Sequence, residues 1–159
     1  MIQSPVVRDA DPVDDGAACA AIYQPYVRES HCTFELEPPE PAEMAARISI
    51  ASETHAWLVA QVEGSVRGYA YAAPHNTRDA YRWACSPSVF VEREWSGLGV
   101  GRALYSALLD RLAELGYLTA TAGIALPNDS SVVLHEKFGF NQVAHYKRMG
   151  YKLGKWHDV

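Results

Sequence analysis

Glycines at alternate positions in the middle of the chain have the most direct chemical meaning. Gly97, Gly99 and Gly101 form the run GLGVG at 97–101, after an apolar segment and before a strongly patterned helical one. Glycine lets backbone amides approach a ligand closely, and the first amides of a helix carry unpaired N–H groups and partial positive charge. Such a loop can hold a phosphate or pyrophosphate. An ordinary tight turn would show the same glycines, so spacing alone leaves both interpretations open.

Two better-known glycine patterns do not fit this loop. The Walker pattern ends in Gly-Lys-Ser/Thr, whereas Gly101 is followed by Arg102 and Ala103. The dinucleotide fingerprint requires a third glycine where Arg102 stands, and it opens a βαβ unit. This loop follows an expected hairpin instead, so both patterns are excluded.

The elements that position the loop follow from hydrophobic periodicity and from glycine and proline punctuation. We expect Pro25 to bend or end the first helix, and Pro87 to impose a bulge or a locally unpaired position within its strand. The order of elements, βααβββαβαββ, predicts one α+β domain with a mixed sheet over residues 1–159. The predicted strands cover residues 2–7, 57–62, 66–73, 84–91, 118–125, 143–148 and 151–159. The predicted helices cover residues 12–23, 42–51 and 100 to about 115. A fourth, short helix is expected to be capped by Asn128 or Asp129 and to end at Gly139.

Composition excludes several classes of protein. The 159 residues are 48% hydrophobic and 21% charged, with a formal net charge of −5, which argues against a disordered chain and against a nucleic-acid groove. No apolar run is long enough to span a membrane, and the first residues lack the apolar segment of a secretory signal. Three separated cysteines suit free thiols in a reducing cytoplasm, and the histidine spacing predicts no metal site.

Further segments carry a resemblance to a known family. They are TFELEP at 33–38, AYRW at 80–83, LPNDSSVVLHEKFGF at 126–140 and GYKLGKWHDV at 150–159. Together with the glycine loop, these motifs in this order resemble the GNAT N-acetyltransferase superfamily, and within it the phosphinothricin acetyltransferase branch. The resemblance covers essentially the whole chain. It implies a central mixed sheet with two splayed parallel strands, at 88–91 and 119–125, flanked by about four helices.

The resemblance also implies acetyl-CoA as co-substrate and indicates the residues that would hold it. The backbone of Phe90 and Val91 would pair with the pantetheine arm like an added strand. Asn128 and Ser131 match positions that contact the cofactor from the other side, and Asn128 suits a helix cap as well. The pyrophosphate would lie on the loop residues Gly97, Leu98, Gly99, Val100, Gly101 and Arg102. Relatives often have Gln or Arg at the position of Ser96 and a second Arg at that of Gly97.

Acetyl transfer requires a base for the amine proton, and it benefits from an acid for the leaving thiolate. His135 matches a position where relatives place Tyr or His near the sulfur, so we expect an acid or hydrogen-bond donor there; a core or cap histidine is the alternative. Ser86 stands where the branch usually has an acidic residue, and a serine hydroxyl is no base without an activator. Three alternatives stay open: Ser86 positions a relaying water, another group (Glu35, Asp79 or His75) substitutes, or the protein is slow or inactive.

The family's acceptors are small amines, often amino-acid-like with an acidic, sulfone or phosphinate group. For such a substrate we expect aromatic walls from Phe34 and Tyr81, a cationic clamp from Arg78 and Arg82, and a contact from Glu35. Solvated surface arginines are the alternative for the clamp. Relatives continue beyond the position of Val159, which indicates either a trimmed sequence or a short last strand.

Three functional hypotheses result. The first is N-acetylation of the primary amine of a small compound of the phosphinothricin, methionine sulfone or methionine sulfoximine type, by direct attack in a ternary complex. The second is acetylation of a protein or peptide amine, and the third is an acyl-CoA-binding sensor that has lost its base. We expect a cytoplasmic homodimer with no nucleic-acid or membrane partner and no metal, in which Trp156 and His157 line either the site or the dimer interface.

Overall fold

The computed structural model describes residues 4–159 and divides them into two compact units. The first unit contains the residues up to Ile22 and Pro39–Ala122. The second contains Tyr23–Pro38 and Gly123–Val159. The element order agrees with the predicted order as far as the fourth helix, whereas the last two strands lie elsewhere than predicted. None of the helices formed by residues 4–159 is long and apolar enough to cross a membrane.

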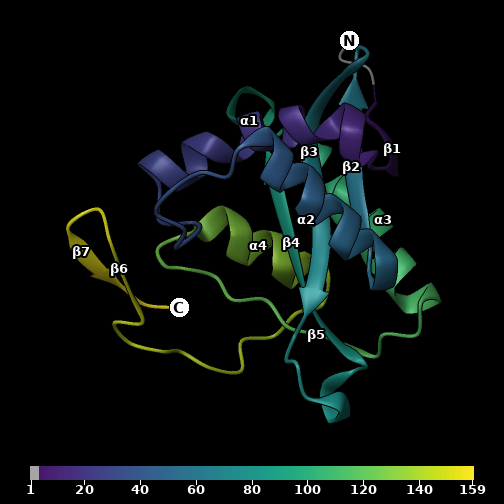
Figure 1. Ribbon diagram of the computed structural model, residues 1–159. Helices are drawn as coiled ribbons and strands as arrows, with labels where there is room; N and C mark the ends of the chain where they lie inside the picture. The colour runs from purple at the N-terminus through teal and green to yellow at the C-terminus, as the bar shows by residue number, and fades with distance from the viewer. Residues whose placement is uncertain (1–3) are drawn as a thin grey trace. The chain divides into compact units, whose positions relative to one another are not determined.

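A mixed sheet of five strands forms the centre of the first unit (Figure 1). Its strands follow one another in sequence order, with three antiparallel pairings and a final parallel one between β4 and β5. The predicted mixed sheet is therefore confirmed. The strands are β1 (Val6–Asp9), β2 (Trp57–Val62), β3 (Ser65–Pro74), β4 (Ala84–Val91) and β5 (Thr119–Ala120).

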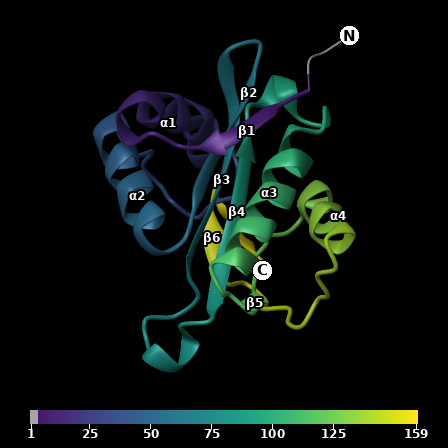
Figure 2. The same cartoon turned by 90° about the vertical axis from the view of Figure 1, so that its right-hand side faces the viewer.

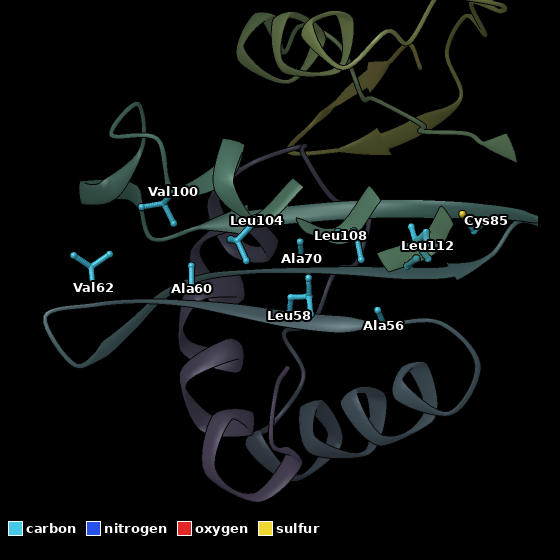
Figure 3. Packing of buried hydrophobic residues seen from close by; sticks show 11 residues of the cluster. Ala56, Leu58, Ala60, Val62, Ala70, Cys85, Val100, Leu104, Leu108 and Leu112 are labelled. Carbon is cyan, nitrogen blue, oxygen red and sulfur yellow. The ribbon is translucent and has the colours of Figure 1, made fainter. Parts of the chain in front are cut away.

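Helices cover both faces of this sheet. They are α1 (Pro12–Glu29), α2 (Pro41–Thr54) and α3 (Val100–Glu114). Figure 2 shows α1 and α2 on one side of the sheet and α3 on the other. The side chains of Leu104, Leu108 and Leu112 point from α3 toward small and aliphatic residues of β2 and β3, as the apolar spacing predicts (Figure 3). Leu115, just after the helix ends, is half exposed.

Gly68 on β3 sets how closely α3 approaches the sheet. A Cβ atom at this position would lie 3.0 Å from Cδ1 of Leu104, 3.0 Å from the carbonyl oxygen of Phe90 and 3.2 Å from Cγ1 of Val100. These are closer than ordinary van der Waals contacts. The first turn of α3 therefore rests on a position where the sheet has no side chain.

The second unit contains α4 (Asp129–Lys137) and a hairpin of β6 (Gly150–Lys152) and β7 (Lys155–His157). Asn128 caps α4, because its Oδ1 accepts a hydrogen bond from the Ser131 amide at 3.3 Å. Leu153 and Gly154 between the two strands both have positive φ, 52° and 77°. Two such residues are typical of the tight hairpin turns that match strand twist.

Pro25 does not end the first helix, which was one of the two outcomes that we predicted for it. The helix α1 continues through Pro25 to Glu29, well beyond the expected end near residue 23. A proline removes one hydrogen bond and costs about 3 kcal/mol in a helix interior. Val27 in the following turn is almost fully buried, so tertiary packing offsets that loss.

Pro87 ends the parallel pairing and causes no bulge between β3 and β4, whose register is unbroken from Gly68↔Val91 to Pro74↔Cys85. The β4–β5 ladder has two register pairs and a last bond, from the Thr121 amide to the Cys85 oxygen at 2.9 Å. The next donor on β4 in a parallel ladder would be residue 87, and proline has no N–H. The strand predicted over 118–125 is therefore wrong beyond Ala120.

The strands predicted at both ends of the chain need correction. Residues 143–148 form no strand, because Arg148 has φ 52° and its amide donates to the Asp158 carboxylate at 2.8 Å instead of to a neighbouring strand. The predicted last strand, 151–159, is divided by the hairpin turn. The first strand is β1, shifted toward Asp9; residues 2 and 3 of its predicted range lie outside the described residues.

A buried ion pair anchors the start of α1, and we predict that removing its cation destabilises the fold. Asp15 is 2% exposed, accepts bonds from Arg8 at 2.7 and 2.8 Å, and accepts one from the Asp11 amide at 2.7 Å. Arg8→Met leaves this carboxylate without its cation. Breaking a fully buried pair costs about 3–5 kcal/mol. Because the Arg8 side chain is 35% exposed, we expect about 2–3 kcal/mol in chemical denaturation at neutral pH.

The matched control is Arg47→Met, which removes an exposed i,i+4 pair to Glu43 at 2.6 Å. That change should cost less than about 0.5 kcal/mol. Burial alone would raise the pKa of Asp15, but the hydrogen bonds from Arg8 and the Asp11 amide outweigh burial and lower this pKa. The stabilisation is thus present above the unfolded pKa of Asp and lost as the pH falls toward the folded one. Equal effects of the two variants would contradict this account.

Candidate active site

The glycine loop has the backbone conformation that glycine allows. Gly97 and Gly99 have φ of 79° and 88°, in the left-handed region that other residues rarely adopt. A Cβ atom at either position would meet nothing within 4 Å. Glycine is therefore required here by the backbone angle and not by lack of space.

The loop leaves a set of amides directed away from the body of α3. Gly99 is the N-cap of this helix, no side chain within residues 4–159 caps it, and the first helical bond runs from the Ala103 amide to the Gly99 oxygen at 3.0 Å. The amides of Val100, Gly101 and Arg102 precede that bond. Three N–H groups at the positive end of a helix dipole fit an anionic group such as the pyrophosphate of acetyl-CoA.

Contacts upstream hold the loop in place. Arg67 donates to the Glu92 carboxylate at 2.8 Å, and its guanidinium lies 5.0 Å from the Trp95 ring. The Glu92 amide in turn donates to the Arg67 oxygen at 2.8 Å. A 3₁₀ turn, η2 (Arg93–Trp95), then leads into the glycines. Leu98, at the tip of the loop, is half exposed.

The strand β4 leads from the candidate catalytic serine to this loop. Cys85 belongs to the core cluster, and Val89 and Val91 pack against it. Ser86, Ser88 and Phe90 alternate with those residues and so lie on the opposite face of the sheet. The ring of Phe90 packs there against Tyr69, with ring centroids 5.6 Å apart.

The side chain of Ser86 lies near that of Thr121, which follows β5 and in turn contacts His75, which follows β3. Oγ of Ser86 is 3.4 Å from Oγ1 of Thr121, which is 2.7 Å from Nδ1 of His75. Of the three possible substitute bases, His75 is thus linked to Ser86 through Thr121. Glu35 belongs to the second unit, where it accepts a bond from the Tyr23 hydroxyl at 3.2 Å. Thr121 was not predicted as a site residue, and its only signal in the sequence is a polar side chain in a predicted strand.

The candidate substrate loop lies between β3 and β4. A short 3₁₀ turn, η1 (Asp79–Tyr81), carries Tyr81, whose ring centroid is 5.6 Å from that of His75. The guanidinium of Arg82 lies 3.6 Å from the centroid of the Trp83 ring, and its Nη1 donates to the Asp79 oxygen at 3.1 Å. Arg82 is therefore engaged within the loop, whereas Arg78 is exposed.

The α4 residues of the second unit form a local hydrogen-bond set. Nδ1 of His135 lies 2.7 Å from the Ser131 carbonyl oxygen, which makes this nitrogen the donor. Burial lowers the pKa of His135, while that backbone hydrogen bond opposes the shift. The ring is thus neutral at neutral pH, with Nδ1 protonated and Nε2 an acceptor. Donation from Nε2 to a sulfur would first require protonation of the ring.

The remaining candidates of the second unit surround its hairpin. The Phe34 ring lies so close to Gly150 that a Cβ atom at Gly150 would overlap it. The rings of Phe34 and His157 are 6.3 Å apart, and His157 stacks on His31 at 4.4 Å. His157 is buried and Trp156 is exposed. The predicted site residues thus form one set in each unit.

Two buried histidines predict how stability depends on pH. Burial lowers the pKa of His55 in the first unit, as it does that of His135 in the second. When the pKa of a histidine is lower in the folded than in the unfolded state, its contribution to stability is fully present at pH values above the unfolded pKa, which is about 6.5. We expect the free energy of unfolding to decrease as the pH falls from about 7 to 5.

The check is urea denaturation across that pH range for the wild type, His55→Phe, His135→Asn and the double variant. Phenylalanine keeps the stacking of His55 on Tyr117, whose ring centroids are 4.8 Å apart. Each single variant should flatten the pH dependence, and the double variant should remove most of it. A wild type equally stable at both pH values would be incompatible with this expectation.

Comparisons with known proteins extend over both units. The family described as "Acetyltransferase (GNAT) domain" matches residues 13–159. A phosphinothricin N-acetyltransferase from Streptomyces viridochromogenes is 39% identical over 153 residues, which cover 96% of this chain and 83% of that protein. An L-methionine sulfoximine/L-methionine sulfone acetyltransferase from Pseudomonas aeruginosa is 30% identical, covering 96% of this chain and 90% of that protein.

A solved structure agrees with these relatives. It is a GNAT superfamily phosphinothricin acetyltransferase from Sinorhizobium meliloti in complex with AcCoA. It matches with a TM-score of 0.93 and 36% sequence identity, over 98% of this chain and 85% of that one.

Proposed function

The chain belongs to the GNAT acetyltransferase family and is an acetyl-CoA-dependent N-acetyltransferase, and we propose that its acceptor is the primary amine of a small amino-acid-like compound. The proposed acceptors are compounds of the phosphinothricin, methionine sulfone or methionine sulfoximine type. Relatives that carry these names support the proposal. The amine would attack the thioester directly, in a ternary complex of both substrates.

The observation that carries the proposal is the uncapped start of α3. Its amides from Val100 to Arg102 follow two glycines in the left-handed conformation. No side chain of the described residues caps this end of the helix. We propose that they hold the pyrophosphate, with Gly97, Leu98 and Gly99 shaping the loop. Acetyl-CoA, when bound, supplies an activated acetyl group as a thioester. The backbone of Phe90 and Val91 is proposed to lie along its pantetheine arm, and Asn128 and Ser131 to contact it from α4.

For the acceptor, the side chains of the loop before β4 divide into two groups. Because Arg82 already stacks on Trp83 and donates to the Asp79 oxygen, we assign the main cationic clamp to Arg78. A planar guanidinium can bind a carboxylate or phosphinate with two parallel hydrogen bonds. Tyr81 and Phe34 are proposed as aromatic walls, and Glu35 as a polar contact. His135 is proposed to act on the sulfur side, in its protonated form.

We propose that residues 1–159 form one catalytic domain, since the family match extends across both compact units. We further propose a cytoplasmic homodimer. Light scattering of the purified protein would test the dimer, with a mass of about twice the 17.5 kDa of one chain as the expected result. A single-chain mass at micromolar concentration would contradict it.

A thiol-release assay tests the substrate class. The purified protein is mixed with acetyl-CoA and, in turn, methionine sulfone, methionine sulfoximine, phosphinothricin, the common amino acids and a lysine-containing peptide. We expect release with at least one of the first three, at a higher kcat/KM than with the peptide. Release with the peptide alone would replace the proposal with a protein-directed activity.

The same assay, combined with calorimetry, tests the sensor hypothesis. Tight acetyl-CoA binding with no thiol release from any amine would mean that the chain binds the cofactor without turning it over. Ser86→Glu should then raise the activity, because it restores an acidic group at the position of Ser86. High activity of the wild type would exclude this alternative.

A further inference from the structure

We infer that His75 is the final proton acceptor for the attacking amine, reached from Ser86 through the hydroxyl of Thr121. We call these three residues the His75 relay. The inference rests on the proposed function, since it assumes that an amine loses a proton near Ser86. It answers how a chain with serine at this position can still deprotonate its substrate.

The backbone brings the relay together at one point of the sheet. Ser86 lies on β4, Thr121 follows β5, and His75 follows β3. The Thr121 amide donates to the Cys85 oxygen at 2.9 Å, and the His75 amide donates to the Ala84 oxygen at 3.4 Å. Both partners are therefore attached to the two residues immediately before Ser86. These backbone hydrogen bonds to β4 fix the positions of Thr121 and His75. The contact between the short side chains of the relay therefore follows from the backbone.

The distances define a short step and a long one. Nδ1 of His75 is 2.7 Å from Oγ1 of Thr121, a distance typical of a strong hydrogen bond. Oγ of Ser86 is 3.4 Å from Oγ1 of Thr121, longer than the ~2.7–2.8 Å of a usual O–H···O bond. Catalytic hydrogen bonds are often long before substrate binds. The Ser86 step is thus the one that a bound amine must shorten.

The three side chains have complementary chemistry. A hydroxyl both accepts and donates a proton, so Ser86 and Thr121 can pass one on without holding a charge. Imidazole is the side chain that takes up and releases a proton near neutral pH. His75 is exposed to solvent, so a proton that reaches its ring can leave to water. The neighbouring Tyr81, with ring centroids 5.6 Å apart, belongs to the proposed substrate loop.

The attacking nitrogen loses two protons during the reaction, and each has a defined acceptor. A substrate ammonium gives one proton to Oγ of Ser86, whose own proton moves to Oγ1 of Thr121, and the Thr121 proton moves to Nδ1 of His75. Acetyl-CoA supplies the carbonyl carbon to which the freed amine nitrogen bonds, and the C–S bond breaks with its electrons on sulfur. The second proton lost by nitrogen ends on that sulfur as the CoA thiol. His75 returns the first proton to water.

This route sets a condition on the His75 ring. Nδ1 must accept from Thr121, so in the neutral ring the hydrogen lies on Nε2. Nitrogen-15 NMR of the histidine rings in the wild type measures this tautomer without any turnover. We expect His75 protonated on Nε2. A ring protonated on Nδ1 would donate to Thr121 and could not accept its proton, which would overturn the relay.

The turnover of matched variants is a second test of the relay, independent of the NMR measurement. Thr121→Val removes the hydroxyl at nearly constant shape, Thr121→Ser keeps it, and Thr119→Val makes the same change at an exposed position outside the relay. We expect kcat to fall at least tenfold in Thr121→Val, to recover substantially in Thr121→Ser, and to be unchanged in Thr119→Val. General-base contributions of about 10²–10⁴-fold set the scale. The KM for acetyl-CoA should stay within about twofold, because the proposed cofactor loop is untouched.

The variant His75→Ala is a third test of the relay. We expect a similar loss of kcat that added imidazole partly restores, an effect that a purely structural role would not give. An active wild type with unchanged kcat in Thr121→Val and His75→Ala would overturn the relay alone. Inactivity of the wild type with every amine would overturn the proposed function and, with it, the relay.

Discussion

Substituting valine for Gly99 is expected to raise the dissociation constant for acetyl-CoA about 10–100-fold, equivalent to ~1.4–2.7 kcal/mol. Gly99 has φ 88°, a backbone angle that costs an L-residue roughly 1–2 kcal/mol and a β-branched one more. The position has open space around it. The side chain therefore fits, and the loop must change its backbone to relieve the strain. That change moves the amides of Val100, Gly101 and Arg102 that we assign to the pyrophosphate.

Gly64→Val is the matched control for this variant. Gly64 lies in the turn between β2 and β3, has φ 78°, and would also place its Cβ in open space. Both variants should lower the free energy of unfolding by a similar amount, about 1–2 kcal/mol. Only Gly99→Val should weaken binding, as measured by isothermal titration calorimetry. Equal affinity of the two variants would remove the loop from the cofactor site.

Gly68→Leu is expected to have the largest effect on stability, about 3 kcal/mol or more in chemical denaturation. A Cβ atom there would lie 3.0 Å from both Leu104 and the Phe90 carbonyl. The carbonyl belongs to β4 and cannot move without breaking the sheet, so α3 has to move instead. Because the helix carries the proposed phosphate-binding amides at its first turn, the affinity for acetyl-CoA should fall as well.

A graded series separates this cause from a general loss of stability. Gly68→Ala should cost about 1 kcal/mol, less than leucine, because only the Cβ must be accommodated. Leu104→Ala removes one of the three atoms that a Cβ at this position would crowd. The double variant Gly68→Leu with Leu104→Ala should thus be less destabilised than the sum of its parts, by about 1 kcal/mol or more. Strict additivity would show that Gly68 and Leu104 do not compete for the same space.

The features predicted well from sequence are those whose signals are local. The bounds of β2 and β4 agree with the prediction, because turn residues flank both strands in the sequence. The start of α3 follows from glycine conformation, and the Asn128 cap from the preference of short polar side chains for helix starts. The family was recognisable from motifs whose order the chain keeps.

The features that failed depend on partners far away in the chain. The continuation of α1 past Pro25 depends on the burial of Val27, which no local pattern reveals. The early end of β5 depends on Pro87 in the neighbouring strand. Thr121 acquires its meaning from His75 and Ser86, which lie 46 and 35 residues away along the chain. A polar residue in a strand becomes interpretable only when the pairing is known.

Pro87 also bears on self-association. An unpaired strand backbone is a template on which another chain can add a strand, which is how many folded proteins aggregate. Beyond Cys85, no register pair among the described residues joins β4 to β5 on that side. With no N–H at residue 87, an added strand cannot pair continuously across this position.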